Sequence, residues 1–210
     1  MGVVAESRDP ETGGHIQRTK NYVRILAEHL ANYPKYQSQL SPEKIELLHC
    51  SAPLHDIGKL AISDTILLKP GPLTSEEFEI MKTHTTIGEK TIESVQNRLG
   101  ESDFLSIARE IAGTHHEHYD GTGYPRGLKG DKIPLSGKLM ALADVYDALI
   151  SKRCYKIPFN HSKAVQIIAD ERGKHFDPDV VDAFLALQEA FRETALEFTD
   201  LDIERKALMS

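Results

Sequence analysis

Residues 113–125 read Gly-Thr-His-His-Glu-His-Tyr-Asp-Gly-Thr-Gly-Tyr-Pro and join an apolar helical run to a glycine-rich loop that ends in proline. Two adjacent histidines, His115 and His116, stand where the apolar run ends. Imidazole is the commonest protein ligand for transition metals. Upstream, His55 and Asp56 follow a second apolar helical run in the same way. Because a helical fold can bring the ends of two such runs together, these clusters predict a shared metal site.

The composition is that of an ordinary globular protein, since 40% of the 210 residues are hydrophobic and 27% are charged. This length suggests one domain with a small appendage and is ample for a buried core. The formal net charge is −7 and no long basic block exists, which argues against binding of a DNA or RNA polymer. No apolar stretch is long enough to span a bilayer, no signal-peptide pattern follows Met1, and two cysteines form no disulfide framework. We therefore expect a cytoplasmic protein without membrane association.

The apolar periodicity is helical along the chain, and no strand pattern persists. Ser41-Pro42-Glu43 is a strong helix start, and Thr74-Ser75-Glu76-Glu77 opens a helix that should run to Gly100. The expected fold is all-α, a compact bundle with a lead-in at 1–14, a main domain at 15–193 and a helical tail at 194–210. Loops are expected at 57–72 and 118–133. The main helices are expected at about 15–32, 42–56, 74–99, 103–116, 134–149, 161–172 and 178–192.

Further histidines and acids have positions that favour a role in metal binding. Asp144 lies in the middle of an apolar helix face, where a carboxylate is costly unless it is paired or bound to a cation. Glu11 and His15 are four residues apart. If the first helix begins before residue 15, the two side chains would lie on the same side of it. Mixed histidine and carboxylate ligands suit ions such as Fe, Mn or Zn, and paired ions can clamp an in-line displacement at phosphorus. The candidate ligands are Glu11, His15, His55, Asp56, His84, His115, His116 and Asp144.

These motifs resemble the HD-GYP subgroup of the HD-domain phosphohydrolases. The resemblance is carried by His55-Asp56 with Lys59, by His115-His116-Glu117, and by the Asp120-Gly121 and Gly123-Tyr124-Pro125 steps, and it covers nearly the whole chain. It implies a bundle of about seven helices. It also implies two or three divalent ions, with Fe or Mn first and Co or Ni as alternatives. The implied activity is hydrolysis of the bacterial second messenger cyclic di-GMP by attack of a metal-bridging hydroxide. The expected product is pGpG, and its further hydrolysis to GMP stays an open alternative.

The same resemblance implies the role of each candidate ligand. One ion would be held by the HD-type ligands His15, His55, Asp56 and Asp144. The second would be held by His84, His115 and His116, with Asp56 as the bridge. Glu11 matches a residue that completes a third site in some family members. No ligand is missing, and Lys138, where arginine is common, is a departure without consequence for the site.

Substrate contacts are implied as well. Lys59 matches the lysine beside the scissile phosphate and, with Asp56, forms the expected catalytic pair. Arg153 and Lys156 match phosphate-binding residues, which would let an acidic protein bind a dianion. Tyr124 and Asp120 are the remaining substrate-binding candidates.

Several alternatives stay open at this point. Glu11 can be an exposed acid, Asp144 a buried acid paired with lysine, and Arg153 with Lys156 a solvated basic link. The Gly-Tyr-Pro loop either shapes the substrate pocket or docks a partner such as a diguanylate-cyclase domain. Proteins of this family are commonly fused to receiver or sensory domains as response-regulator outputs. Because the chain begins almost at the first candidate ligand, we expect an excised catalytic domain. Alternative functions are a hydrolase specific for cyclic GMP-AMP, a cyclic-dinucleotide-binding signalling module and a nucleotide phosphomonoesterase.

Overall fold

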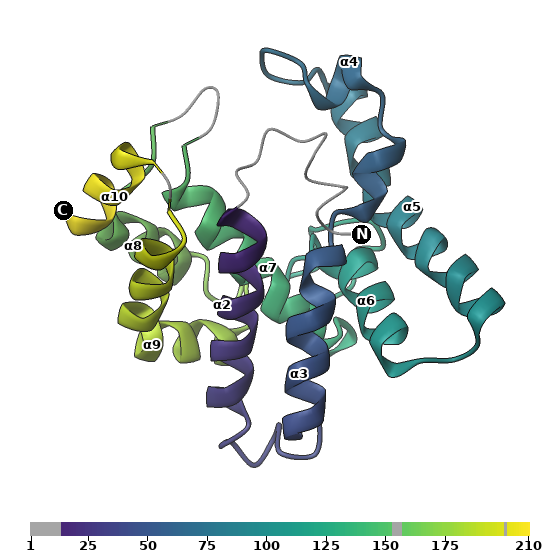
Figure 1. Ribbon diagram of the computed structural model, residues 1–210, viewed down its shortest axis with the longest axis horizontal. Coiled ribbons are helices and arrows are strands. Elements are labelled where there is room, and N and C mark those ends of the chain that lie inside the picture. The colour runs from purple at the N-terminus through teal and green to yellow at the C-terminus, as the bar shows by residue number, and fades with distance from the viewer. Residues whose placement is uncertain (1–13, 153–156, 200) are drawn as a thin grey trace.

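A computed structural model describes residues 14–152, 157–199 and 201–210, and these residues form an all-α fold (Figure 1). The predicted fold class is confirmed: the described ranges contain no β-strand, only an isolated bridge between Arg172 and Phe176. The α-helices are α2 (Gly14–Leu30), α3 (Pro42–Ser51), α4 (Asp64–Leu67), α5 (Ser75–Leu99), α6 (Asp103–Thr114), α7 (Leu135–Ile150), α8 (His161–Asp170), α9 (Pro178–Glu197) and α10 (Asp202–Met209). Short 3₁₀ helices are η1 (Ala52–Leu54), η2 (Ile57–Ala61) and η3 (Gly130–Lys132).

The helix starts follow from side-chain caps that satisfy the first free backbone N–H groups. Ser41 accepts a hydrogen bond from Lys44 N, and Pro42 occupies the first turn of α3. Asp177 caps α9 in the same way, with Pro178 as its first residue. At α5, Thr74 and Glu77 form a capping box in which each side chain accepts from the backbone N–H of the other.

The capping box makes a quantitative prediction for α5. Replacing Thr74 with alanine should lower the free energy of unfolding by about 1 kcal/mol, because Glu77 N loses its acceptor. Urea denaturation measures this change. Ser102 provides the control, since it precedes α6 without making a side-chain capping hydrogen bond. Ser102→Ala should therefore cost clearly less, and an equal cost would show that the Thr74 cap contributes nothing specific.

The expected loop at 57–72 contains regular structure instead. Residues 57–61 form η2 and residues 64–67 form α4. Pro53 lies in η1, a 3₁₀ turn that follows α3 directly, so α3 ends at Ser51, before the expected helix end at 56. α9 continues to Glu197, five residues beyond the expected end at 192. The short helix expected in the tail is α10.

The core lies between α2, α3, α7, α8 and α9. α2 packs on α3, α7 and α9, so it occupies the centre of the bundle, with α8, α9 and α10 on one side in Figure 1. Tyr22 of α2 stacks on Phe191 of α9 at a ring-centroid distance of 4.4 Å, and Tyr146 of α7 meets both rings edge-on. All three side chains are fully buried. This aromatic contact joins the helices that carry His15 and Asp144.

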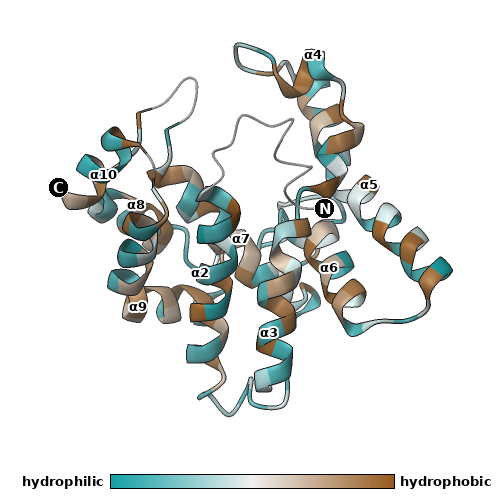
Figure 2. Cartoon of the chain, viewed as in Figure 1, coloured by the Kyte–Doolittle hydropathy of each residue, from teal (hydrophilic) through white to brown (hydrophobic). Residues whose placement is uncertain are grey.

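A second apolar cluster holds α5 and α6 to η1 and η2. Its buried members include Leu54, Ile57, Ile92 and Ala112. α5 packs on α6 and on η2, and with α4 it extends away from the rest of the bundle in Figure 1. Hydropathy alternates along the ribbons as expected for amphipathic helices (Figure 2). The His55-Asp56 step therefore lies where the two clusters meet.

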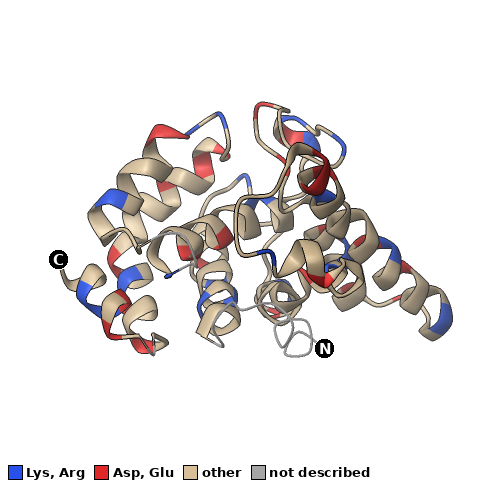
Figure 3. Ribbon diagram, turned by 90° about the horizontal axis from the view of Figure 1, so that it is seen from above, with Lys and Arg blue, Asp and Glu red and all other residues tan. Residues whose placement is uncertain are grey.

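The distribution of charged and apolar residues over the fold is as the composition predicts. Basic and acidic residues are interspersed over the helices in Figure 3, without a continuous basic face in that view. Among the described residues, no helix combines the length and the apolar character needed to cross a bilayer.

Candidate metal centre

The fold brings seven of the eight candidate ligands into two adjacent groups. The first group contains His15, His55 and Asp144, and the second contains Asp56, His84, His115 and His116. Within each group, one ligand atom from every residue lies within 4.8 Å of the others. The groups adjoin, because the His55 and His115 rings meet edge-on with centroids 5.3 Å apart. Glu11, the eighth candidate, lies outside the described residues.

Each ligand stands at a position that its helix fixes. His15 is the second residue of α2, and Asp144 and His84 lie inside α7 and α5. His55 follows η1 and Asp56 precedes η2, while His115 follows the last residue of α6. Rigid helix ends and helix faces thus supply the side chains. Such placement holds a coordinating constellation more closely than loops would.

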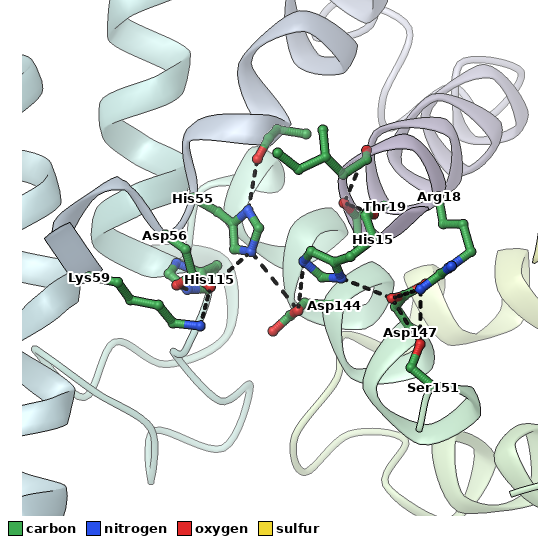
Figure 4. A network of polar contacts seen from close by, with 12 residues as sticks. His15, Arg18, Thr19, His55, Asp56, Lys59, His115, Asp144, Asp147 and Ser151 are labelled. Carbon is green, nitrogen blue, oxygen red and sulfur yellow. Dashed lines mark hydrogen bonds and ion pairs between the residues drawn. The ribbon is translucent and has the colours of Figure 1, made fainter. Parts of the chain in front are cut away.

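Asp56 connects the two groups through its two carboxylate oxygens (Figure 4). Its Oδ2 lies 3.2 Å from Nε2 of His55, and its Oδ1 lies 3.2 Å from Nε2 of His84. Nε2 of His115 is 3.6 Å from the same Oδ1. One oxygen therefore faces the first group and the other faces the second. This is the arrangement that a carboxylate needs in order to bridge two cations.

Backbone carbonyls orient three of the histidine rings. Nδ1 of His55 donates to Ala52 O at 2.9 Å, Nδ1 of His84 to Met81 O at 2.8 Å, and Nδ1 of His115 to Ile111 O at 3.0 Å. A carbonyl can only accept, so each of these rings carries its proton on Nδ1. The lone pair on Nε2 then points into the centre, which is the state a metal ligand requires.

The electrostatics of the centre differ from group to group: burial lowers the pKa of His55, but the neighbouring Asp56 and Asp144 carboxylates outweigh burial and raise it. Burial raises the pKa of the Asp56 carboxyl, but the positive charge of Lys59 and the contacts with His55 and His115 outweigh burial and hold the pKa well below its usual value. Burial lowers the pKa of His115, and burial together with the neighbouring histidines lowers the pKa of His116 strongly. Asp56 is therefore ionised, and these two imidazoles are neutral, at neutral pH.

The donor set fits divalent transition-metal ions. It consists of neutral imidazoles and carboxylates, which suit Fe, Mn, Zn and related ions better than Ca or Mg. Two buried atoms of the centre, His55 Nε2 and Asp56 Oδ1, make no hydrogen bond of good geometry. Buried polar atoms of this kind are costly unless a partner compensates them. A cation between the ligand atoms would provide that partner at both positions.

Lys59 lies beside the centre and is mostly buried. Its Nζ is 2.8 Å from Asp56 Oδ2, one turn away along η2. Its side chain is 16% exposed, so the ammonium group can reach a ligand that enters the centre from solvent. The structure thus places the predicted catalytic lysine against the predicted bridging carboxylate.

The Gly-Tyr-Pro loop closes over the second group. The Tyr124 ring stacks on the His116 ring with centroids 4.7 Å apart. Gly123 makes this possible, because a Cβ there would lie 2.2 Å from His118 N and 2.5 Å from His116 O. The buried Glu117 carboxylate accepts from the backbone N–H groups of the residues at 126 and 128, which holds the loop in place. Tyr124 is thereby positioned at the edge of the centre.

The other substrate-binding candidates are less defined by the structure. Asp120 accepts hydrogen bonds from the N–H and hydroxyl of Thr122, so its described side-chain contacts stay inside its own loop. Arg153 and Lys156 lie outside the described residues. The substrate roles of all three stay predictions.

The sequence did not predict a role for two buried charged residues that lie next to the centre. Asp147 follows Asp144 by one turn of α7, and Arg18 follows His15 by one turn of α2. Their side chains form an ion pair with a separation of 2.6 Å, and both are at most 2% exposed. Their position three residues after a candidate ligand, on the same helix face, is the signal that could have revealed them.

A third cluster of potential metal ligands differs from the first two because it is mostly exposed. Glu46, His49 and Cys50 lie close together on the exposed surface of α3. The guanidinium group of Arg24 contacts both Glu46 and His49, so a positive charge already fills the space between them. This cluster therefore does not resemble the buried centre.

Fold and site together define an all-α protein with a paired histidine–aspartate centre built across helix ends. The sequence matches the HD domain family over residues 4–180. The chain belongs to this family, and its motifs are of the HD-GYP type.

Similar proteins support the assignment. The chain is 58% identical over 200 residues to a "Cyclic di-GMP phosphodiesterase" of Vibrio cholerae serotype O1, an alignment that covers 95% of this chain and 41% of the relative. It is 41% identical over 180 residues to a "3'3'-cGAMP-specific phosphodiesterase 2" of the same organism, which covers 86% of this chain and 32% of that protein. The chain thus spans less than half the length of these two relatives.

A solved structure supports the fold. "Bd1817, a HDG"Y"P protein from Bdellovibrio bacteriovorus" superposes with a TM-score of 0.58 at 22% identity. The match covers 85% of this chain and 54% of that one. At this identity the likeness concerns the arrangement of helices.

Proposed function

We propose that this chain is the catalytic domain of a metal-dependent phosphodiesterase that hydrolyses a cyclic dinucleotide, with cyclic di-GMP as the first candidate substrate. The observation that carries the proposal is the position of Asp56, whose two oxygens face two separate groups of histidine and carboxylate ligands. A pair of cations held by these two groups would suit in-line displacement at phosphorus. The names of the relatives supply the substrate class.

Each of the two ligand groups would hold one metal ion. His15, His55 and Asp144 would hold one ion, His84, His115 and His116 the other, and Asp56 would bridge them. Glu11 would complete a third site. When bound, such ions polarise the phosphoryl oxygens and lower the pKa of a water molecule that can attack phosphorus. Fe or Mn is the first candidate for the ions, and Co or Ni the next.

The side chains of this protein have roles of their own in the reaction. Asp56 keeps the two groups in a fixed register, and the ammonium group of Lys59 stabilises the negative charge that builds up on the scissile phosphate. Lys59 would also give a proton to the leaving 3′ oxygen. Arg153 and Lys156 would hold the second phosphate. Tyr124 would contact the substrate at the edge of the centre, where its hydroxyl stays protonated because burial raises its pKa.

Further partners are part of the proposal. The loop that carries Tyr124 and Pro125 could dock a diguanylate-cyclase domain, and a receiver or sensory domain could be fused to the chain. A cytoplasmic location follows from the nature of the substrate and stays a prediction. The geometry of the centre does not bear on the docking partner, the fused domain or the location.

Cyclic GMP-AMP is the second candidate substrate. A relative that is 41% identical over 86% of the chain is named as specific for it. Both dinucleotides present the same pair of phosphodiesters to the centre and differ in one base. The metal ligands therefore do not distinguish them.

Parallel turnover assays test this proposal. Anaerobically purified protein, loaded with Mn or Fe(II), is given cyclic di-GMP and cyclic GMP-AMP, and the linear dinucleotide is separated from the mononucleotide products by chromatography. We expect hydrolysis of cyclic di-GMP, and its loss to background when a chelator removes the ions. Hydrolysis of a phosphomonoester alone would favour the monoesterase. Binding without turnover in a metal-loaded sample would favour the signalling module.

A further inference from the structure

Asp147 is a buried carboxylate that contacts a candidate ligand without facing the centre. It is 1% exposed and lies one turn after Asp144 in α7. Its Oδ2 accepts a hydrogen bond from Nδ1 of His15 at 2.9 Å. The other ring nitrogen of His15, Nε2, lies 3.8 Å from Asp144 Oδ1. The His15 ring thus spans the space between an outer carboxylate and the centre (Figure 4).

Arg18 fixes the orientation of this outer carboxylate. Its Nε donates to Asp147 Oδ1 at 2.6 Å and its Nη2 donates to Oδ2 at 2.9 Å. This two-point contact determines both the position and the plane of the carboxylate. Nη2 also donates to Ser151 Oγ at 3.0 Å, so the pair is tied to the end of α7. Arg18 is itself 2% exposed, and the pair therefore has no freedom to relax toward solvent.

The turn after α9 holds Arg18 from the other side. Nη1 of Arg18 donates to Phe198 O at 3.2 Å. α2 approaches this turn closely, because a Cβ on Gly14 would lie 2.3 Å from the same carbonyl oxygen. Glu204 of α10 holds this turn in place. Its carboxylate accepts hydrogen bonds from Thr199 Oγ1 at 2.6 Å and from Lys152 N at 2.8 Å. Phe198, Thr199 and Glu204 lie beyond position 180, where the family match ends.

We infer that Asp147 is the positioning residue of His15, and that Arg18 and the turn at Phe198 hold Asp147 in place. The inference deepens the proposed function, since it assigns an outer support to one ligand group only. The carboxylate accepts the Nδ1 proton, which leaves the Nε2 lone pair directed at the space beside Asp144. His55, His84 and His115 are oriented by backbone carbonyls instead of a carboxylate. The orientation of His15 thus depends on an ion pair between α2 and α7.

Cobalt(II) titration tests this inference without any nucleotide. We expect Asp147→Ala to weaken binding of one ion by about 10–100-fold, the usual effect of losing an outer partner of a histidine ligand, and to leave the other ion unchanged. Asp147→Asn should lose less, because its amide oxygen can still accept from His15. Absorption spectra and metal content per chain report the two ions. His84→Ala, which removes a ligand of the second group, identifies the ion that each variant affects.

Asp182→Asn is the matched control. Asp182 makes the same two-point contact with an arginine, Arg172, at 2.8 and 2.6 Å, but on the exposed surface of α9. This variant should bind both ions as the wild type does. Unchanged affinity in Asp147→Ala, or equal weakening of both ions, would overturn the positioning role. Because cobalt binding needs no substrate, it separates this inference from the choice of substrate: failure of the wild type to hydrolyse a cyclic dinucleotide would overturn only the proposed function.

Discussion

Replacing Asp56 with alanine should reduce hydrolysis of cyclic di-GMP by about 10³-fold or more, which corresponds to ~4 kcal/mol of lost transition-state stabilisation. The physical reason is the double role of this side chain. Its oxygens face His55 on one side and His84 on the other, so its removal separates the two ligand groups. Its loss also leaves Lys59 without the carboxylate that it contacts at 2.8 Å. Both effects act on the reacting phosphate.

Turnover, metal content per chain and helical circular dichroism measure the outcome together. The expected result is a folded protein with fewer bound ions and background turnover. Asp103→Ala is the control, because this exposed acid lies in the first turn of α6, at the opposite end of the helix from His115. It should keep full activity. If Asp56→Ala retained turnover, the bridging role would have to be abandoned.

The fold was predictable where short-range signals determine it. Ser41 and Thr74 begin their helices by capping, and Gly100 ends α5 with a positive φ of 95°. η2 and α4 were predicted as loop, because helical segments of five residues or fewer are too short to show a helical periodicity in the sequence. Their conformation depends on contact with α5. A single sequence does not show such a contact.

The centre was predictable to a similar degree. Residue type and motif order predicted the candidate ligands, and the structure brings His84 of α5 to Asp56 although 28 positions separate them in the sequence. Arg18 and Asp147 escaped notice because 129 positions separate them, and because each looks like an ordinary charged residue of its helix. Only the packing of α2 on α7 makes them a buried pair. Glu11, Arg153 and Lys156 stay predictions.

Gly58, between the bridging carboxylate and Lys59, supports a second prediction of large effect. A Cβ at this position would lie 1.9 Å from His84 O and 2.6 Å from Gly88 N, so η2 touches the backbone of α5 directly. Backbone cannot rotate away as a flexible side chain can. We expect Gly58→Ala to lower the free energy of unfolding by about 3 kcal/mol, the upper end of the usual range for overpacking.

The same substitution should also weaken metal binding, because the candidate ligand Asp56 directly precedes η2 and the candidate ligand His84 lies in α5. A shift that relieves the clash moves Asp56 away from His84, whose carbonyl is the clashing atom. Urea denaturation and cobalt titration therefore should both change in Gly58→Ala. A stability loss with unchanged metal affinity would show that the two helices separate without disturbing the ligands.

Two other glycines give a graded comparison. A Cβ on Gly71 would meet nothing within 4 Å, so Gly71→Ala should change stability by less than about 1 kcal/mol. A Cβ on Gly88 would lie 3.3 Å from Gly58 N, which is tight, but the helix gains about 1 kcal/mol of propensity when alanine replaces glycine. Gly88→Ala should therefore be nearly neutral. A large loss of stability at Gly58, with small changes at Gly88 and Gly71, would show that the close approach of η2 to α5 requires glycine at position 58. Equal effects at all three positions would assign the loss to glycine flexibility alone.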